Sequence, residues 1–285
     1  MATNVHSTAV IAAGAELGRD VEIGPYCVVG PHVQIGDRTR VGPQVVIDGI
    51  TRIGEDNVII GQASLGGVPQ DLSYKGEPTR LTIGDRNTIR EFVTINRGTI
   101  KGGGETRIGS DCLLMACCHV AHDCEVRDRI IMGNNVLLAG HVLVCEQANI
   151  SGGAAAHHFV TIGSFAYVGG MTRMVQDVPP YMILEGHPSR VRGVNVIGLQ
   201  RGGYSEEHVD ALRNAFRRIY RSGNPRKRTL EELKVEFGAN PLVTNLVRSL
   251  EDTESGAKGR YRESLREQFR RTGEERMQQS AAARL

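Results

Sequence analysis

The sequence predicts a mainly β protein in which a parallel β-helix of hexapeptide repeats is followed by a C-terminal α-helical domain. Aliphatic residues return every six positions between Leu17 and Met174, with two interruptions. A glycine often follows the aliphatic residue, as in Ile23-Gly24. A fixed six-residue period of this kind is typical of a parallel β-helix. Beyond Ser205 the apolar residues take the spacing of amphipathic helices instead.

The repeats also predict the shape of the coil and the position of its loops. Three hexapeptides form one triangular turn of about 18 residues, and roughly eight such turns would stack at the spacing of neighbouring strands. Two segments, residues 66–82 and 97–107, break the six-residue count and must loop out. Insertions in a repeat array often gather on the binding face. We therefore expect a coil domain over residues 1–188 with two functional loops.

Residues 189–258 are predicted to form the helical domain. A first helix can begin at the N-cap Ser205, because two glutamates follow in its first turn. A second helix is expected to begin near Thr229 and a third to cover residues 241–251. The last segment, residues 259–285, is charged and sparsely apolar, so we expect a frayed helix with a disordered end.

The composition narrows the class of protein. A formal net charge of +2 gives no argument for a nucleic-acid partner. The N-terminus lacks the pattern of a signal peptide, and no apolar run approaches the length of a membrane span. Four of the six cysteines fall at one phase of the repeat, where small buried side chains are expected: Cys27, Cys112, Cys118 and Cys124. No pair has zinc-knuckle spacing, so we predict reduced thiols and a cytoplasmic protein.

Histidines cluster in the second half of the coil. Five of the nine lie close together in the sequence: His119, His122, His141, His157 and His158. Residues one turn apart stack in columns, which places His122, Gly140 and His158 in one column. Asp123 and His141 stack in the adjacent column. The repeat therefore predicts that these side chains converge on one small surface patch.

Three interpretations of this patch remain open. The histidines could be solvated corner residues. They could form a zinc site as in the γ-class carbonic anhydrases, which share this architecture and need three imidazoles around one ion. An imidazole could also act as a general base, because it titrates near neutral pH. Neighbouring residues of a strand face opposite sides, so we expect Asp123 to serve a histidine of another subunit or the substrate, and not His122.

Several short motifs resemble those of the UDP-N-acetylglucosamine 3-O-acyltransferases, bacterial enzymes that start lipid A synthesis. The resemblance covers about residues 1–220, and its motifs are HVAHDC (119–124), LAGHV (138–142), QDLSYKGEPTR (70–80), IGDRN (83–87), RGT (97–99), DVPPY (177–181) and GVNVIGLQR (193–201). It implies a left-handed coil, a cytoplasmic homotrimer with sites between subunits, and no metal or cofactor. The implied donor is a (R)-3-hydroxyacyl thioester on acyl carrier protein. The implied acceptor is the 3-hydroxyl of UDP-N-acetylglucosamine.

The resemblance also assigns roles to single residues. His122 matches the general base, and Gly140 matches the residue whose backbone N–H stabilises the oxyanion. Gly170 matches the position that sets acyl length, although it could also be an ordinary corner glycine of the repeat. The remaining matches are to substrate-contacting positions: Asp71, His119, Asp123, His141, His157, Asn195 and Arg201.

The sequence departs from the family pattern at five positions near these motifs. They are Ser73 in place of a lysine, Asn96 in place of a histidine, His158 in place of a glutamine, Ile197 in place of an acidic residue, and Gly202 in place of an arginine. The pair of His122 and Gly140 is intact, so we expect acyl transfer. The departures leave open a 3-amino acceptor, which would give an amide.

A basic segment follows the coil. Residues 190–228 contain ten Lys or Arg against three Asp or Glu. A charge run of this kind is commonly a solvated helix face. Acyl carrier protein is acidic, so a basic surface near the cleft can also serve as its docking site. We expect four arginines to contribute: Arg213, Arg217, Arg218 and Arg221.

Overall fold

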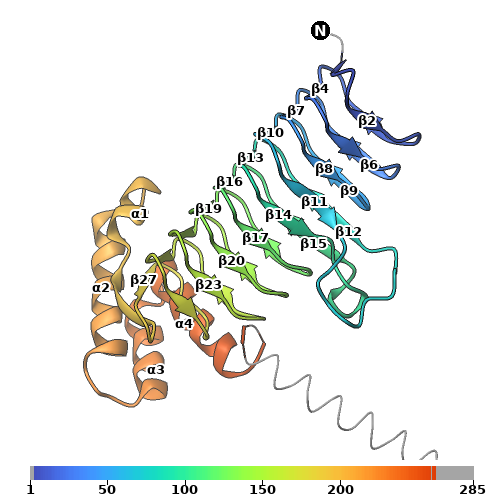
Figure 1. Cartoon of the computed structure of the whole chain (residues 1–285). Helices are drawn as coiled ribbons and strands as arrows, with labels where there is room; N and C mark the ends of the chain where they lie inside the picture. Colours follow the sequence, from blue (N-terminus) through green and yellow to red (C-terminus); the bar gives the residue numbers. More distant parts are fainter. Residues whose placement is uncertain (1–2, 258, 261–285) are drawn as a thin grey trace, which may run out of the picture.

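The computed structural model describes residues 3–257 and 259–260 and has the predicted architecture (Figure 1). A three-sided coil of short parallel strands runs along the long axis, and a group of helices covers its C-terminal end. The first residue of most strands points outward and the last points into the coil, where it is buried. The stacked inner residues, such as Ile47, Ile95 and Val120, form one continuous apolar core.

The first side of the coil, sheet A, is parallel except for a C-terminal hairpin. Its strands, in spatial order, are β1 (Asn4–Val5), β4 (Glu22–Ile23), β7 (Arg40–Val41), β10 (Val58–Ile59), β13 (Thr88–Ile89), β16 (Leu113–Leu114), β19 (Ile131–Met132), β22 (Asn149–Ile150), β25 (Tyr167–Val168), β27 (Met182–Glu185) and β28 (Arg190–Val194). From β10 to β25 every outward residue of this sheet is uncharged.

The second side, sheet B, carries an apolar outer surface. Its strands are β2 (Val10–Ile11), β5 (Val28–Val29), β8 (Val46–Ile47), β11 (Ser64–Gly67), β14 (Thr94–Asn96), β17 (His119–Val120), β20 (Leu137–Leu138), β23 (Ala155–Ala156) and β26 (Arg173–Met174). Four outward aliphatic residues of this sheet are exposed to solvent: Val10, Val28, Val46 and Leu137.

The third side, sheet C, is polar outside. Its strands are β3 (Glu16–Leu17), β6 (Val33–Ile35), β9 (Ile50–Ile53), β12 (Arg80–Ile83), β15 (Glu105–Ile108), β18 (Glu125–Val126), β21 (Leu143–Val144) and β24 (Thr161–Ile162). Its exposed outward residues include Glu16, Gln34, Arg52, Arg107 and Glu125. Two sides of the prism therefore carry few charges over much of their length, whereas the third is charged.

The corners between the sheets are tight turns that place one residue per turn in the left-handed backbone region. Many of these residues are not glycine; Asp20, Tyr26 and Asp123, for example, have φ of 58°, 59° and 62°. The left-handed region costs a side chain roughly 1–2 kcal/mol, so the stacked coil must hold these turns in place. Successive corner residues project outward in columns, one column along each edge of the coil.

Both predicted insertions occur at the same edge. Residues 68–79 connect β11 to β12, and residues 97–104 connect β14 to β15 and contain the 3₁₀ turn η1 (Ile100–Gly102). Each connects sheet B to sheet C, so both lie on the edge that we call the B/C corner. The prediction that both segments loop out is confirmed, and the two loops lie on one side of the coil (Figure 1).

The C-terminal part differs from the sequence prediction in its details. The connector before Ser205 contains the antiparallel hairpin β27–β28 and the short helix α1 (Val196–Arg201). Ser205 caps α2 (Glu206–Tyr220) as predicted, because its side chain accepts a hydrogen bond from the His208 N–H. Helix α3 (Arg226–Phe237) begins three residues before Thr229, directly after Pro225, whose φ of −56° suits a helix start.

Helix α4 (Pro241–Glu254) runs three residues beyond its predicted end. The helices pack on the hairpin through a second apolar cluster that includes Leu212, Leu233 and Leu246. The predicted boundary at residue 188 falls in the hairpin turn between β27 and β28. The predicted tail, residues 259–285, lies outside the described residues except for Gly259 and Arg260. Among the described residues, no helix combines the length and hydrophobicity that crossing a bilayer requires.

Candidate active site

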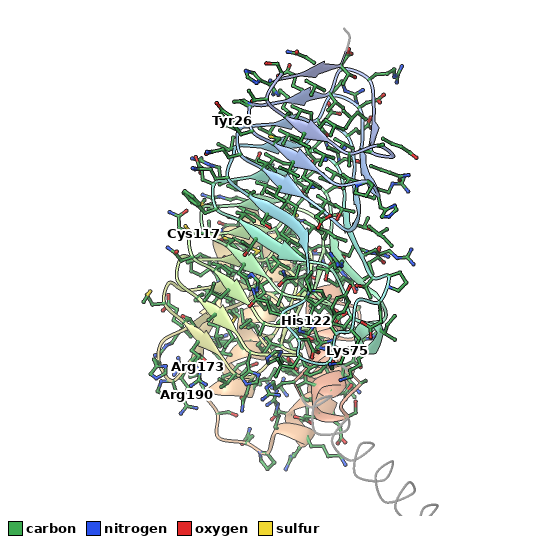
Figure 2. The ribbon with its side chains drawn as sticks, turned by 45° about the vertical axis from the view of Figure 1, so that its right-hand side comes forward. Tyr26, Lys75, Cys117, His122, Arg173 and Arg190 are labelled. Atoms are coloured by element: carbon green, nitrogen blue, oxygen red, sulfur yellow. The ribbon has the colours of Figure 1, made fainter. Side chains whose placement is uncertain are left out.

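The histidine patch forms at the B/C corner, on the turns that follow the two insertions. His119 of β17 pairs with Leu137 of β20, which pairs in turn with Ala155 of β23. This register advances by one turn at each step and confirms the predicted columns. His122 and Gly140 consequently lie one above the other where the strands of sheet B end, at the B/C corner. Figure 2 shows His122 on the same side of the molecule as Lys75 of the first insertion.

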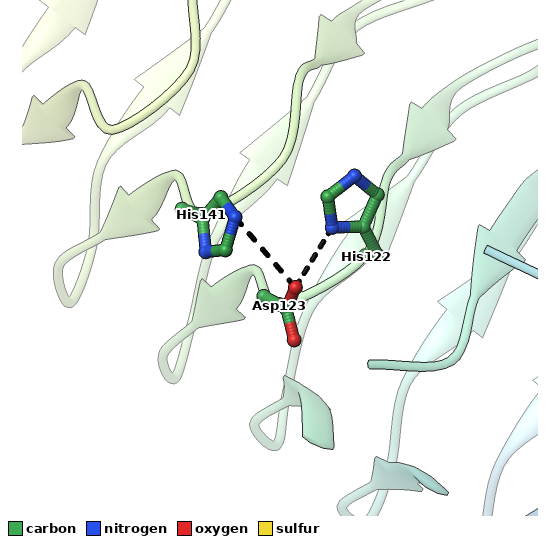
Figure 3. Close-up of side chains that lie close together, drawn as sticks. All are labelled: His122, Asp123 and His141. Carbon is green, nitrogen blue, oxygen red and sulfur yellow. Dashed lines mark hydrogen bonds and ion pairs between the residues drawn. The ribbon is translucent and has the colours of Figure 1, made fainter. Parts of the chain in front are cut away.

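His122 forms a buried hydrogen-bonded pair with Asp123. The His122 Nδ1 lies 2.8 Å from the Asp123 Oδ2, and the two side chains are 7% and 0% exposed (Figure 3). The prediction that Asp123 would serve another subunit or only the substrate is therefore wrong. Asp123 is a corner residue with φ of 62° and not part of a strand, so its side chain turns back to its neighbour.

The second insertion holds the Asp123 carboxylate in place. The Thr99 backbone N–H donates a hydrogen bond to Asp123 Oδ1, and the Thr99 hydroxyl donates one to Oδ2; both are 2.6 Å long. Gly102 packs so closely that a Cβ there would overlap the carboxylate. Burial alone would raise the pKa of Asp123, but the hydrogen bonds from His122 and Thr99 outweigh it and lower this pKa. Asp123 is therefore ionised near neutral pH.

An ionised Asp123 determines the tautomer of His122. A carboxylate can only accept hydrogen bonds, so the His122 Nδ1 must carry a hydrogen. In the neutral ring the Nε2 is then a proton acceptor, and it lies on the ring edge away from Asp123 (Figure 3). His122 lines a cavity of about 450 Å³, which gives this nitrogen access to a substrate. The arrangement is that of an oriented general base.

His141 completes the group around Asp123. Its Nε2 lies 3.7 Å from the Asp123 Oδ2, its ring meets His122 edge-on with centroids 5.3 Å apart, and it stacks on Phe159 at 4.5 Å. The ligand atoms of His122, Asp123 and His141 lie within 4.8 Å of one another, as a metal site would require. This set has two imidazoles where the zinc prediction needs three, and both Asp123 oxygens already accept hydrogen bonds. The geometry favours the base over the metal site.

Gly140 lies directly against the His122 ring. A Cβ at Gly140 would lie 2.6 Å from the His122 Cε1, so only glycine fits without moving the imidazole. The flanking N–H groups of Ala139 and His141 donate to carbonyl oxygens of the adjacent turns. Within the described chain no backbone acceptor takes the Gly140 N–H. The Gly140 amide therefore lies beside the His122 ring without a backbone acceptor in the described chain, at the position where the resemblance predicts an oxyanion donor.

The cavity around His122 combines polar and apolar walls. It is lined by Gln70, His119, Ala121, His122, Leu137, Leu138, Ala139, Gly140, Ala155, Ala156, His157, His158 and Arg173. The His119 Nδ1 lies 2.8 Å from the Thr94 hydroxyl, and burial together with the nearby His122 lowers the pKa of His119. Burial also lowers the pKa of His157, next to Arg260, and of His158, next to His157. These imidazoles are thus neutral at pH 7 and suited to hydrogen bonding.

The remaining predicted residues lie outside this cavity. Asp71 is in the first insertion, where a hydrogen bond from the Ser73 N–H at 2.8 Å lowers its pKa, with a smaller effect of His122. Gly170 lies at the corner between sheets A and B, so the width of sheet B separates it from the B/C corner that carries His122. A Cβ at Gly170 would meet only the Gly152 oxygen, at 3.3 Å.

Asn195 and Arg201 are placed on a different edge of the coil. Asn195 donates to the Phe165 carbonyl at 2.8 Å and caps α1 by accepting from the Gly198 N–H. Arg201 is exposed in the last turn of α1. Phe165 is a corner residue between sheets C and A, so this C/A corner is separated from His122 by the whole width of sheet C.

Thr99 is the residue around Asp123 that the sequence pattern does not single out. Its motif was noted, but the hydrogen bonds of Thr99 to Asp123 depend on how the second insertion folds over the corner. Gln70, Thr94 and Arg173 also contribute to the cavity or to its histidines without having been singled out. The available signal is the position of Thr99 within the second insertion, because the break in the hexapeptide count already places this insertion near the histidine patch.

Comparisons with known proteins agree with this geometry. The family model for domain 2 of UDP-N-acetylglucosamine O-acyltransferase matches residues 177–259, and the model for bacterial transferase hexapeptide repeats matches residues 14–49. The acyl-[acyl-carrier-protein]–UDP-N-acetylglucosamine O-acyltransferases of two Anaeromyxobacter dehalogenans strains are each 46% identical over 252 residues, which is 88% of this chain and 98% of theirs.

Solved structures give the same result. LpxA from Acinetobacter baumannii aligns with a TM-score of 0.85 at 41% identity and covers 90% of this chain and 98% of its own. The UDP-N-acetylglucosamine acyltransferase LpxA from Bacteroides fragilis aligns with a TM-score of 0.86 at 37% identity, with the same coverage. The predicted left-handed β-helix with C-terminal helices is thereby confirmed. This chain belongs to the acyl-[acyl-carrier-protein]–UDP-N-acetylglucosamine O-acyltransferase family.

Proposed function

We propose that the chain transfers a (R)-3-hydroxyacyl group from acyl carrier protein to the 3-hydroxyl of UDP-N-acetylglucosamine, the first step of lipid A synthesis. The observation that carries this proposal is the buried pair of His122 and Asp123 beside the Gly140 amide. A base, its orienting carboxylate and an oxyanion donor are the groups that acyl transfer to a hydroxyl requires.

The reaction follows from the positions of these groups. The His122 Nε2 removes the proton of the sugar 3-hydroxyl while the oxygen of this hydroxyl attacks the carbonyl carbon of the thioester. Asp123 stabilises the resulting imidazolium through the Nδ1 hydrogen. The Gly140 N–H donates to the oxyanion of the tetrahedral intermediate. Collapse of the intermediate breaks the C–S bond, and the imidazolium returns the proton to the departing thiolate. The thioester is already activated, so the proposal needs no metal or cofactor.

The surfaces of the coil support a homotrimer. A ring of three subunits uses a heterologous contact, in which one patch of each subunit packs on a different patch of the next. Sheets A and B offer two such patches with few charges, whereas sheet C is charged. The edge between A and B also exposes large apolar corner residues, with Tyr26, Phe92 and Met171 being 65%, 55% and 80% exposed. We place this edge on the three-fold axis.

This arrangement would bring the two separated parts of the site together. When sheet B packs on sheet A of the next subunit, the B/C corner of one subunit meets the C/A corner of its neighbour. His122 is at the first corner, and Asn195 is bound to the second through Phe165. The neighbour's Arg201 would then bind the phosphates of the nucleotide, for which a guanidinium is well suited.

Acyl carrier protein would dock on α2 near this cleft. Three of the four predicted arginines already have partners in the chain. Arg213 pairs with Asp210, Arg218 pairs with Glu232 and Glu236, and Arg221 donates to the Arg192 carbonyl oxygen. Arg217 is exposed on the same helix and forms no ion pair among the described residues. Arg217 therefore has the larger share of the proposed docking. No disulfide joins any of the six cysteines in the part of the chain that the structure describes, as expected in a reducing cytoplasm.

The proposal is tested by an acyl-transfer assay with UDP-N-acetylglucosamine and a panel of (R)-3-hydroxyacyl carrier proteins. The wild type should turn over, and His122→Ala should lose about 10²–10⁴-fold in kcat, because it lacks the base. His32→Ala, at an exposed position far from the cavity, is the matched control. Turnover only with a 3-amino acceptor would replace the ester by an amide. Failure with both acceptors, together with stoichiometric zinc in the purified protein, would contradict the proposal.

A further inference from the structure

A second carboxylate, Asp177, connects the end of the coil with the end of the helical domain. Its Oδ1 accepts a hydrogen bond from the Thr161 N–H of the coil at 2.7 Å. Its Oδ2 accepts one from the Thr253 hydroxyl of α4 at 3.1 Å. The Arg260 N–H, beyond α4, donates to Oδ1 at 3.1 Å. One side chain thus links the end of the coil to Thr253 and Arg260, which lie 76 and 83 positions later.

The chain passes directly over this carboxylate at Gly259. Gly259 is buried and has φ of 80°, and a Cβ there would overlap the Asp177 carboxyl group. Only glycine combines this backbone conformation with such a close approach. The close approach of Gly259 and the hydrogen bond from the Arg260 N–H to Asp177 together fix the position of the Arg260 backbone. The Arg260 side chain lines a cavity next to these contacts.

Arg260 lines a basic cavity next to the catalytic one. This cavity has a volume of about 1180 Å³ and lies between the last turns of the coil, the hairpin and the helices. Five arginines line it: Arg190, Arg192, Arg221, Arg226 and Arg260. Two carboxylates also line the cavity. Glu254 pairs with Arg226, and Asp177 accepts the hydrogen bonds described above. The cavity is consequently cationic.

Two further observations favour a ligand at the border of the two cavities. His157 lines both this cavity and the one around His122, so the two are adjacent. The hydroxyl of Tyr220, another lining residue, is buried and has no hydrogen-bond partner among the described residues. A buried hydroxyl without a partner costs free energy, which a bound acceptor would recover.

We propose that Arg260, positioned by Asp177 and Gly259, binds a phosphate group of one of the two substrates where the basic cavity meets the catalytic cavity. This inference rests on the proposed acyl transfer. A guanidinium recognises a phosphate by paired charged hydrogen bonds. Both substrates carry phosphate: the prosthetic arm of the donor has one as a phosphodiester, and the acceptor has two as a diphosphate. The role is substrate binding, so Arg260 should affect KM and not the chemical step.

The test compares Arg260→Gln with the wild type while each substrate is varied separately. Loss of a charged hydrogen bond should raise the KM of one substrate about tenfold and leave its kcat within about twofold. Arg260→Lys, which keeps the charge, should fall between the two. Acyl-phosphopantetheine and acyl-pantetheine, which differ by the phosphate, identify the source. If the donor phosphate is the ligand, Arg260→Gln raises the KM of acyl-phosphopantetheine and leaves that of acyl-pantetheine unchanged. If the acceptor diphosphate is the ligand, only the KM of UDP-N-acetylglucosamine rises.

Controls separate binding from structure. Arg52→Gln, on the outer face of sheet C, should change neither KM. Asp177→Asn should raise the same KM as Arg260→Gln, and the double variant should show no further rise, since both changes act through one contact. KM values for both substrates within about twofold of wild type in Arg260→Gln would overturn the inference. That result would leave the acyl transfer itself intact, because wild-type turnover and its loss in His122→Ala are measured independently.

Discussion

Two edges of the same coil use the same backbone turn for different purposes. The C/A corner presents a column of residues with positive φ and alternating charge: Asp20, Arg38, Asp56, Arg86, Asp111 and Arg129. Arg38 pairs with Asp56 and Arg86 with Asp111, each at 2.7 Å, and these side chains are 39% to 53% exposed. The B/C corner presents Asp123 and His141 in equivalent turns, but the Asp123 side chain is fully buried.

The difference between the two edges comes from what covers them. Exposed ion pairs contribute little to stability, because water solvates both charges. A buried carboxylate is costly unless several donors satisfy it. At the B/C corner the second insertion supplies such donors from Thr99, and His122 supplies another. The repeat thus provides a regular frame, and an insertion at one corner converts a turn residue into part of the proposed catalytic group.

The largest expected difference between the edges concerns their aspartates. Asp123→Asn should lower kcat by about 10²-fold or more, because an amide can present its N–H to Nδ1 and favour the wrong His122 tautomer. Asp56→Asn, in the exposed column, should leave kcat within about twofold and barely shift the melting temperature. Steady-state kinetics and thermal unfolding of both variants make the comparison. Equal kcat values for the two variants would contradict the assigned role of Asp123.

The second prediction asks whether the two edges meet between subunits. His122→Ala and Arg201→Ala should each be severely impaired as homotrimers. When the two variants are co-expressed with different tags and mixed trimers are purified, each mixed ring pairs an intact His122 with a neighbour's intact Arg201 at one interface, which is about a third of its sites. Activity should therefore return to roughly that fraction of wild type. If both residues act within one subunit, no mixed trimer has an intact site, and activity should stay at the level of the parents.

The sequence was sufficient for those features that depend on the period alone. The hexapeptide count predicted the coil, the positions of both insertions, and the stacking of His122 with Gly140 and of Asp123 with His141. Charges in the first turn and a capping serine predicted α2. These features are local or repeat regularly, so no knowledge of distant contacts was needed.

Features that depend on single backbone angles or on long-range packing could not be predicted in this way. Asp123 was expected to face away from His122, because the period marks a strand and a corner equally and does not reveal a φ of 62°. Thr99 reaches Asp123 from 24 positions earlier through an irregular loop. The hairpin after the coil was missed because its residues, 182–194, are too few to establish a pattern.

The smallest expected effect applies the contrast between paired and unpaired charges to α2. Arg217→Glu should raise the KM for acyl carrier protein severalfold, about 3–10-fold at low salt, through lost steering of an acidic partner. Arg218→Gln removes a side chain that Glu232 and Glu236 already neutralise, so its effect on this KM should be smaller. Kinetics at two ionic strengths would check this, since the Arg217 effect must shrink as salt rises. A larger effect from Arg218→Gln than from Arg217→Glu would show that docking depends on the shape of the helix pair and not on its unpaired charge.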